Sequence, residues 1–434
     1  MMKISKRRIW LLVSVVTATC VLRYIYASWA VDVYAYQGFT RIDVTAQALV
    51  VQILLLIVTV FLMPLRIDRP SDFFFMFYTW FVLLPAAAFY AASGYVGEFG
   101  AIVLYAILAF PCIAIASIRK IPIKLPVAPF IPEKMLVAGV LSVSGIVFAI
   151  AYLQGIKFSL EFDAMYERRM IGRDVIGSRN LFAYAFAATI NGFVPFLGLL
   201  GGYKRSLMLG GVAVFIAVAG FAAIGTKSPV AVSILFFALG WLQSEKMSAR
   251  LPGLFASLMV ALILTAVLLF QLIANSFLID VFLRRSFFTT ASNIGIYWDL
   301  VSSYSAQEIF LSRKNFGVPI TFYVGEHYYG NSASNININA FLLAFADSGL
   351  VWYLLSIVGV GIFFAAVDYR FKNSGYVGYM LLGAMYGLLL SEQAWTTALA
   401  SSGAILLFII LSCVKFTERS ANRSFIKYRP SGVF

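Results

Sequence analysis

The long apolar stretches of this chain constrain its fold more than any other feature. The stretch 254–279 contains no charged residue, and a helix needs about 20 mostly apolar residues to cross a bilayer. Similar stretches follow one another along the chain and are separated by short polar breaks. Because the backbone must satisfy its own hydrogen bonds in lipid, stretches of this length favour helices. The sequence therefore predicts an all-α polytopic membrane protein.

Composition supports a single integral membrane domain over residues 1–434. The chain is 62% hydrophobic and 12% charged, with a mean hydropathy of +0.90, which excludes an ordinary soluble domain. The N-terminus has the charged start of a signal peptide but no clear small-residue cleavage site, so we expect its apolar stretch to remain as the first span. About twelve transmembrane helices are predicted, at 9–26, 46–65, 72–91, 99–117, 135–153, 180–202, 206–224, 229–243, 254–279, 349–367, 376–390 and 397–414.

The positions of lysine and arginine predict which side of the membrane each break faces. With the N-terminus inside, 21 of the 33 lysines and arginines fall in inside segments. The outside breaks around 92–98 and 391–396 contain none. Since basic residues concentrate in the cytoplasmic loops of membrane proteins, we expect both termini in the cytoplasm.

Two outside loops break this charge pattern. The loops 154–179 and 280–348 are the longest breaks, and together they hold nine basic residues. Loops of this length inside a compact protein are usually functional or disordered, and the aromatic and apolar content of the second loop argues against disorder. We expect short helices at the outer interface in these enlarged loops, covering a cavity between the spans.

Adjacent arginines stand at the start of the second loop. Guanidinium groups match phosphate oxygens bidentately and stay charged when desolvated. We therefore expect Arg284 and Arg285 to hold a lipid-linked phosphate or pyrophosphate, although an arginine at the end of a span also contacts ordinary phospholipid headgroups. Lys227 either joins this cationic site or snorkels to the interface. The basic residues expected to bind substrate are Arg168, Arg169, Arg173 and Lys227.

A reaction that adds a hydroxyl nucleophile also needs a base. The single histidine, His327, lies in the second loop beside Glu326, and its ordinary pKa suits proton abstraction near neutral pH. Asp347 is a further candidate, and the alternative is a structural histidine among tyrosines. Asparagine amides can bind sugar hydroxyls, although asparagines also occupy turns and helix caps. Aromatic rings can stack on sugars, although they also form the aromatic belt at the membrane interface. The residues expected to contact sugar are Asn335, Asn337 and Tyr328.

The sequence predicts neither a metal nor a cofactor. It has no Asp-x-Asp pair, and its three cysteines lie inside apolar stretches without paired spacing, so no zinc site or disulfide framework is indicated. The net charge of +14 is explained by topology and by anionic lipid headgroups. We expect membrane lipid, and no nucleic acid, as a partner.

The layout resembles the Wzy-type O-antigen polymerases, in the group that also includes the O-antigen ligases. Three segments carry the resemblance. "GTKSPVAVSILF", around Lys227, resembles a segment between central spans, and Arg284 and Gly295 fit an Arg-x10-Gly pattern. "NINAFLLAFADSGLVWYLLSIVGVG" resembles the junction where a short helix leads into a span. The first loop has no glycine at the matching distance from Arg168 or Arg169.

The resemblance implies a metal-independent glycosyltransferase of the bacterial inner membrane, with its active site facing the periplasm. It would transfer a growing glycan from undecaprenyl pyrophosphate to the non-reducing end of the next lipid-linked oligosaccharide unit, in lipopolysaccharide O-antigen or a related surface polysaccharide. His327 or Glu326 would remove the proton, and Arg284 and Arg285 would stabilise the departing pyrophosphate. A chain-length regulator protein is a further expected partner.

Three other functions remain open. An O-antigen ligase would transfer the glycan to lipid A core instead. A flippase for lipid-linked oligosaccharide would carry charges within many spans. An acyltransferase would place its histidine near an acyl donor on the cytoplasmic side or in the middle of the membrane. The concentration of unexplained charge at one face favours transfer chemistry at the surface.

Overall fold

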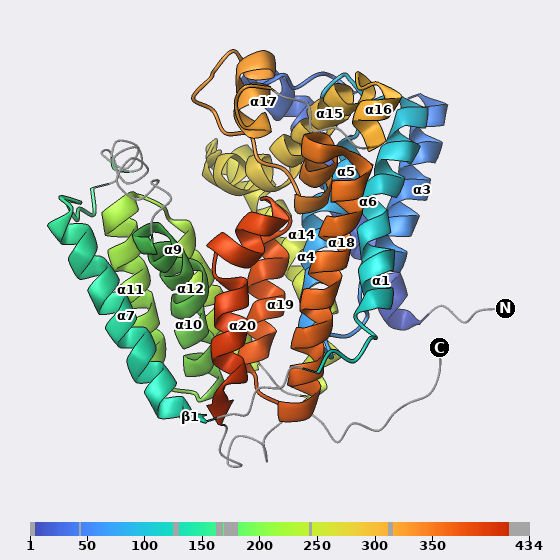
Figure 1. Cartoon of the computed structure of the whole chain (residues 1–434). Helices are drawn as coiled ribbons and strands as arrows, with labels where there is room; N and C mark the ends of the chain where they lie inside the picture. The colour runs from blue at the N-terminus through green and yellow to red at the C-terminus, as the bar shows by residue number, and fades with distance from the viewer. Residues whose placement is uncertain are drawn as a thin grey trace.

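The computed structural model describes residues 5–42, 45–124, 130–161, 168, 181–242, 245–310 and 316–415. Within these ranges the chain is almost entirely helical, as the apolar stretches predict. Figure 1 shows most helices running between two ends of the molecule. We name these the α17 end, after α17 (Ile320–Tyr329), and the β1 end, after β1 (Ile131–Pro132).

Length and composition make this a multi-pass membrane protein. Eight described helices are long and apolar enough to cross a membrane, and three shorter apolar helices accompany them. The all-α membrane fold is thus confirmed, while the number twelve stays a prediction. The eight are Lys6–Val33 (α1, η1, α2), Pro70–Phe89 (α4, η3, α5), Glu98–Ile118 (α6), Glu133–Leu153 (α7), Leu181–Tyr203 (α9, η4, α10), Leu207–Ile224 (α11), Leu251–Ile273 (α14) and Ala340–Ser374 (α18). The shorter ones are α3 (Ala46–Leu62), α12 (Ser228–Leu242) and α19 (Gly378–Leu389).

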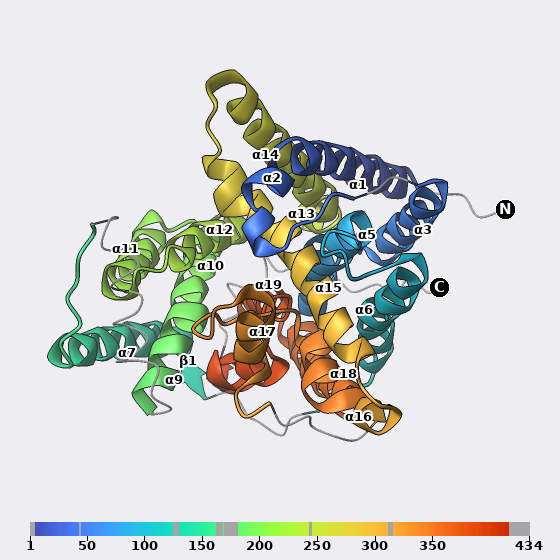
Figure 2. The ribbon, with the colours of Figure 1, turned by 90° about the horizontal axis from the view of Figure 1, so that it is seen from above.

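The centre of the bundle is formed by α4, α18 and α19. Every residue of α4 is buried, and its Phe74 ring packs against the rings of Phe341 and Phe364 on α18. Seen from the α17 end, α7 and α11 lie on one side of these helices, and α1 and α3 lie on the other (Figure 2). A helix that is apolar on nearly all faces must be covered by lipid or by protein, and the apolar residues 73–78 of α4 are covered by protein.

A short parallel strand pair closes the β1 end. Ile131 and Pro132 of β1 pair with Val414 and Lys415 of β2. This pairing joins the start of α7 to the segment that follows η6 (Thr397–Ser401) and α20 (Ala404–Ser412). Segments far apart in the sequence are thereby fixed to each other.

The predicted second loop is largely helical. The predicted span 254–279 is shorter than expected, because α14 ends at Ile273 and Ala274 adopts a left-handed conformation with φ of 52°. A π-helical segment η5 (Ile279–Phe288) then continues directly into α15 (Thr289–Ser302), followed by α16 (Ala306–Phe310) and α17. Most of α15 is buried, so this part of the loop packs into the bundle.

A break in α18 lies where the sequence placed the start of a span. Ser348 and Gly349 have non-helical backbone angles, and Gly349 has φ of 75°. A Cβ at Gly349 would lie 2.7 Å from the carbonyl oxygen of Ile309 on α16. Both the left-handed backbone and this close approach require glycine, and the kink lets α16 pack against α18.

Candidate functional site

The two adjacent arginines of η5 point to different neighbours. The Arg284 guanidinium lies 4.8 Å from the centre of the Tyr34 ring, and its Nη1 donates to Oε1 of Gln37 at 3.4 Å. Successive side chains leave a helix about a quarter of a turn apart, so Arg285 faces elsewhere. Arg284 therefore fastens η5 to the segment 34–37, and the expectation that both arginines hold one phosphate remains a prediction.

The two residues of the Arg-x10-Gly pattern contact different parts of the protein. Arg284 and Gly295 lie on one continuous helix, where eleven residues correspond to about 15 Å along the axis. A Cβ at Gly295 would lie 2.0 Å from Oγ of Ser93. Gly295 thus allows α15 to approach the segment before α6, while Arg284 contacts Tyr34.

Arg285 is exposed and lies within electrostatic range of Glu392. Glu392 follows α19 in the short segment before η6, and its side chain is also exposed. The surrounding protein nevertheless raises the pKa of the Glu392 carboxyl above its usual range, while the positive charge of Arg285 acts to lower it. Water reaches the carboxylate, but protein atoms occupy much of the space around it. Such an environment is typical of functional carboxylates.

A backbone hydrogen bond places Glu392 beside the asparagine-rich segment. The Ala340 N–H donates to the Leu390 carbonyl oxygen at 2.9 Å, which joins the start of α18 to the end of α19. Just before Ala340, Asn335 and Asn337 are exposed, as alternation in an extended segment requires. The structure therefore brings the two asparagines selected from the sequence to the same part of the α17 end as Glu392.

The other polar residues of this segment have local structural roles. Asn339 is buried and caps α18, since its side chain accepts from the Leu342 N–H at 3.0 Å. Asn331 accepts from the Ala333 N–H at 3.0 Å in the turn after α17. These are the capping and turn roles that asparagine commonly has.

The two candidate bases on α17 face solvent. His327 and Glu326 are both exposed. The His327 ring stacks on Tyr323 with a centroid distance of 5.4 Å and an interplanar angle of 9°, and it meets the edge of Tyr328 at 5.0 Å. His327 thus packs among tyrosines, which is the arrangement expected of a structural histidine.

Tyrosines of α17 attach this helix to α15. The Tyr328 hydroxyl donates to Oδ2 of Asp299 at 2.8 Å, and the Tyr329 hydroxyl donates to Oδ1 of Asn293 at 2.8 Å. Burial raises the pKa of Tyr328 above its usual range and raises the pKa of Tyr329 to about 12, so both hydroxyls keep their protons at neutral pH. The Tyr328 hydroxyl thus holds α17 in place, while the stacking of its ring on a sugar remains a prediction.

The basic residues of the first loop lie near a different group of helices. Arg168 is buried, its Nη2 donates to the Glu161 carbonyl oxygen at 2.7 Å, and its guanidinium lies 5.8 Å from the centre of the Phe221 ring on α11. Lys227 is exposed just beyond the end of α11. Both belong to the side of the molecule that carries α7 and α11 (Figure 2). Arg169 and Arg173 lie outside the described residues.

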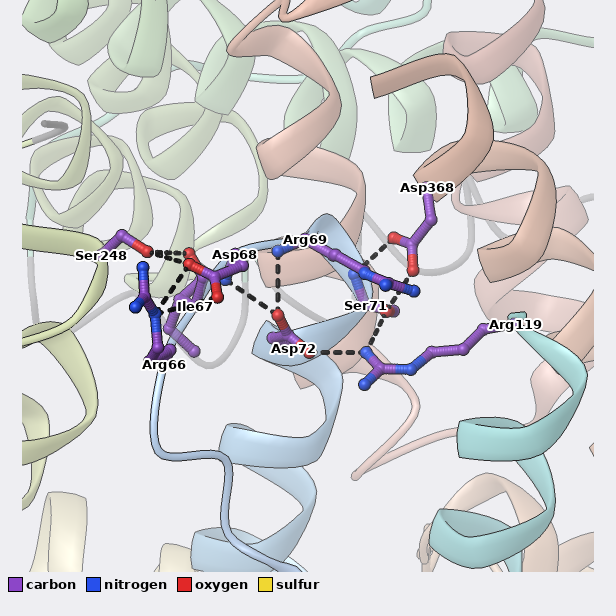
Figure 3. A network of polar contacts seen from close by, with 9 residues as sticks. All are labelled: Arg66, Ile67, Asp68, Arg69, Ser71, Asp72, Arg119, Ser248 and Asp368. Atoms are coloured by element: carbon purple, nitrogen blue, oxygen red, sulfur yellow. Dashed lines mark hydrogen bonds and ion pairs between the residues drawn. The ribbon is translucent and has the colours of Figure 1, made fainter. Parts of the chain in front are cut away.

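A polar network at the β1 end was not expected from the sequence (Figure 3). Ser71 donates from its N–H and its Oγ to the two carboxylate oxygens of Asp368, at 3.0 and 2.6 Å. Arg119 donates to Ser71 at 2.7 Å and forms an ion pair with Asp72 at 2.5 Å. Asp72, in the first turn of α4, and Asp368, within α18, are thus brought together at this end of the bundle.

This network joins four helices. Asp72 also accepts from the backbone N–H groups of Asp68 and Arg69 at 2.9 and 2.8 Å, and Ser248 of α13 (Glu245–Ser248) donates to Asp68 at 2.7 Å. The carboxylates are satisfied by donors within the cluster, as buried charges require. The network thus fixes α4, α6, α13 and α18 to one another.

The arrangement at the α17 end combines a guanidinium group, a carboxylate with a raised pKa and exposed amides. Among the described residues, no three His, Cys, Asp or Glu side chains are grouped so that they could hold a metal ion. Sequence reasoning missed Glu392, whose signal was a single carboxylate in a break that contains no lysine or arginine. No protein-family model, curated protein or solved structure matches this chain.

Proposed function

We propose that this protein is an integral membrane glycosyltransferase that polymerises lipid-linked oligosaccharide units. The observation that carries the proposal is that Arg285 lies within electrostatic range of Glu392 and that a backbone hydrogen bond joins the segment of Glu392 to the one that carries Asn337, at one end of a bundle of apolar helices. A diphosphate-linked glycan needs a cation at the diphosphate, a proton acceptor at the attacking hydroxyl and amides at the sugars. These three groups are of the kinds found together here.

The donor in this proposal is a growing glycan on undecaprenyl pyrophosphate, and the acceptor is the next lipid-linked repeat unit. Arg285 stabilises the negative charge that develops on the departing pyrophosphate, a role that a planar guanidinium performs well. Both substrates are held by their lipid chains at the same end of the bundle, so proximity contributes to the rate. Asn335 and Asn337 contact the sugar hydroxyls.

A second anion-binding position is proposed at Arg168. Its Nε and Nη1 are buried without a hydrogen-bond partner among the described residues, and a buried donor without a partner is costly. Lys227 lies just beyond the end of α11, the helix whose Phe221 ring lies near the Arg168 guanidinium. A lipid-linked anion on this side of the bundle would satisfy these donors.

The remaining assignments follow from this function. The membrane is the bacterial inner membrane, both termini lie in the cytoplasm, and the α17 end faces the periplasm. The product is an O-antigen or a related surface polysaccharide, and a chain-length regulator protein is the expected protein partner. Cysteine labelling of Ser332, which is exposed in the turn after α17, tests this orientation: a membrane-impermeant reagent applied from the periplasm should reach it.

Deletion of the gene gives the most direct test of the proposed function. Without a polymerase, surface glycan should be reduced to single repeat units attached to lipid A core on a denaturing gel. Without a ligase or a flippase, no repeat units should reach the core. Normal long chains in the deletion strain would refute all three functions.

A complementation series then tests Arg285. Arg285→Ala should reduce polymerisation about 100-fold or more, the scale seen when one charge-stabilising donor is removed, and Arg285→Lys should rescue poorly because it lacks the planar fork. The matched control is Arg41→Ala, which removes an arginine that is exposed and paired with Asp32. Equal chain lengths for the Arg285→Ala and Arg41→Ala proteins, at equal abundance, would refute the role of Arg285.

A further inference from the structure

Glu392 is held in place from two sides. Its N–H donates to the Leu389 carbonyl oxygen at 3.0 Å, and the neighbouring Gln393 donates through Nε2 to Oγ of Ser402 at 3.1 Å. The hydrogen bond between Ala340 and Leu390 holds the same segment against α18. The carboxylate therefore stands on a backbone anchored to α18, α19 and η6, as a reacting group must be.

The other carboxylates at the α17 end are occupied or differently placed. Four of them accept hydrogen bonds from neighbouring side chains: Asp280, Asp299, Glu308 and Asp347. Glu98 lies in the first turn of α6, where a carboxylate stabilises the helix. Glu326 is exposed on α17. Asp32 is exposed and ion-paired with Arg41. Glu392 differs from these carboxylates because the surrounding protein raises its pKa while the charge of Arg285, on another element, acts on it.

The charges around Glu392 suit a proton acceptor. The charged group that faces it from η5 is Arg285, while the first turn of α18 and the described residues of η6 carry no charge. The surrounding protein raises the pKa of the Glu392 carboxyl and thereby makes the carboxylate a stronger base, while the positive charge of Arg285 acts to lower that pKa. His327, by contrast, stacks on a tyrosine of its own helix.

We propose that Glu392 is the general base that accepts the proton of the attacking sugar hydroxyl, an inference that rests on the proposed function. The hydroxyl oxygen forms the new bond to the anomeric carbon of the donor glycan as its proton passes to the Glu392 carboxylate. The bond between the anomeric carbon and the diphosphate oxygen breaks, and its electron pair leaves with the lipid diphosphate beside Arg285. The proton then passes from Glu392 to water, which restores the carboxylate.

The test uses the purified full-length protein in lipid nanodiscs, with lipid-linked repeat units as the substrate and gel separation of the polymer. Glu392→Gln should lower the rate about 100-fold or more, because general-base catalysis contributes about 10²- to 10⁴-fold. Glu392→Asp should retain part of the activity. Glu98→Gln is the matched control at the same end and should keep the wild-type rate. Size-exclusion chromatography verifies that each variant is folded.

The pH profile separates a base from a structural carboxylate. Wild-type kcat/KM should fall as pH is lowered and Glu392 takes up a proton, and this acid limb should be absent in Glu392→Gln. Arg285→Gln removes the charge that lowers the pKa of Glu392. As pH is lowered, the residual kcat/KM of this variant should therefore begin to fall at a higher pH than that of the wild type. An unchanged acid limb in either variant, or a wild-type rate in Glu392→Gln, would overturn the proposal.

Failure of this inference differs from failure of the proposed function. If the wild-type protein elongates the lipid-linked units while Glu392→Gln does so equally well, only the role of Glu392 is refuted. If the folded wild-type protein forms no polymer, the proposed function and the role of Glu392 are both refuted.

Discussion

Replacing Gly202 by Ala should separate two helices that contact each other through their backbones. Gly202 is on α10 (Val194–Tyr203), and a Cβ built there lies 1.9 Å from the Phe237 carbonyl oxygen and 2.8 Å from the Trp241 nitrogen of α12. On the facing helix, a Cβ at Gly240 would lie 2.1 Å from the Leu199 carbonyl oxygen. Small residues on both sides are what permits such an approach between membrane helices.

The size of the effect follows from these distances. The Cβ that the Gly202→Ala substitution adds would be about 1 Å closer to the Phe237 oxygen than real Cβ atoms come to any neighbour, and a backbone carbonyl cannot rotate away. Overpacking typically costs about 1–3 kcal/mol, while alanine returns up to about 1 kcal/mol through its helix propensity. We expect a net loss of about 2 kcal/mol in the free energy of unfolding for Gly202→Ala.

The measurement is the fraction of monodisperse protein that remains after heating in detergent. The matched control is Gly211→Ala on α11, where a Cβ would meet nothing within 4 Å, so this variant should be as stable as the wild type or slightly more stable. If Gly202→Ala and Gly211→Ala lose the monodisperse peak at the same temperature, the backbone contact between α10 and α12 is not as tight as argued.

Two further variants test the network at the β1 end and the start of α18. Arg119→Ala should lower the free energy of unfolding by about 3 kcal/mol, because it leaves the buried Asp72 carboxylate without its cation. Its control, Arg66→Ala, removes an exposed ion pair and should change the free energy of unfolding by less than about 1 kcal/mol. Equal thermal transitions of the two variants would contradict this. Asn339→Ala should lower the free energy of unfolding by about 1 kcal/mol because it removes the cap of α18, and Asn339→Ser should restore most of that loss. The same heating series measures both variants. An alanine variant as stable as the wild type would show that the cap contributes nothing.

Hydropathy located several helices well. The predicted spans 99–117 and 135–153 match α6 and α7 within two residues at each end, because lipid requires a long apolar stretch whatever the neighbours are. The end of α14 and the full length of α18 were not predicted. The α14 helix ends at exposed residues inside an apolar stretch, where Ala274 takes a left-handed conformation that hydropathy does not reveal. The first turns of α18 are packed inside the protein, where hydropathy no longer marks the boundary of a helix.

The candidate site was predicted only in part. The sequence selected Arg285, Asn335 and Asn337 because their residue types suit phosphate and sugar. It could not separate Arg285 from Arg284, since the contact with Tyr34 is made by a segment far away in the chain. It also passed over Glu392, whose significance comes from the neighbouring Arg285.

The sequence by itself determined that this chain is an all-α, multi-pass membrane protein, because an apolar stretch in lipid has to form its own backbone hydrogen bonds. Only the tertiary structure decided which polar groups meet. It tied Arg284 to the segment 34–37, brought Arg285 within electrostatic range of Glu392, and closed the network around Arg119 at the other end. The reason is physical: hydropathy depends on each residue alone, whereas ion pairs and raised pKa values depend on helices that pack together from distant parts of the chain.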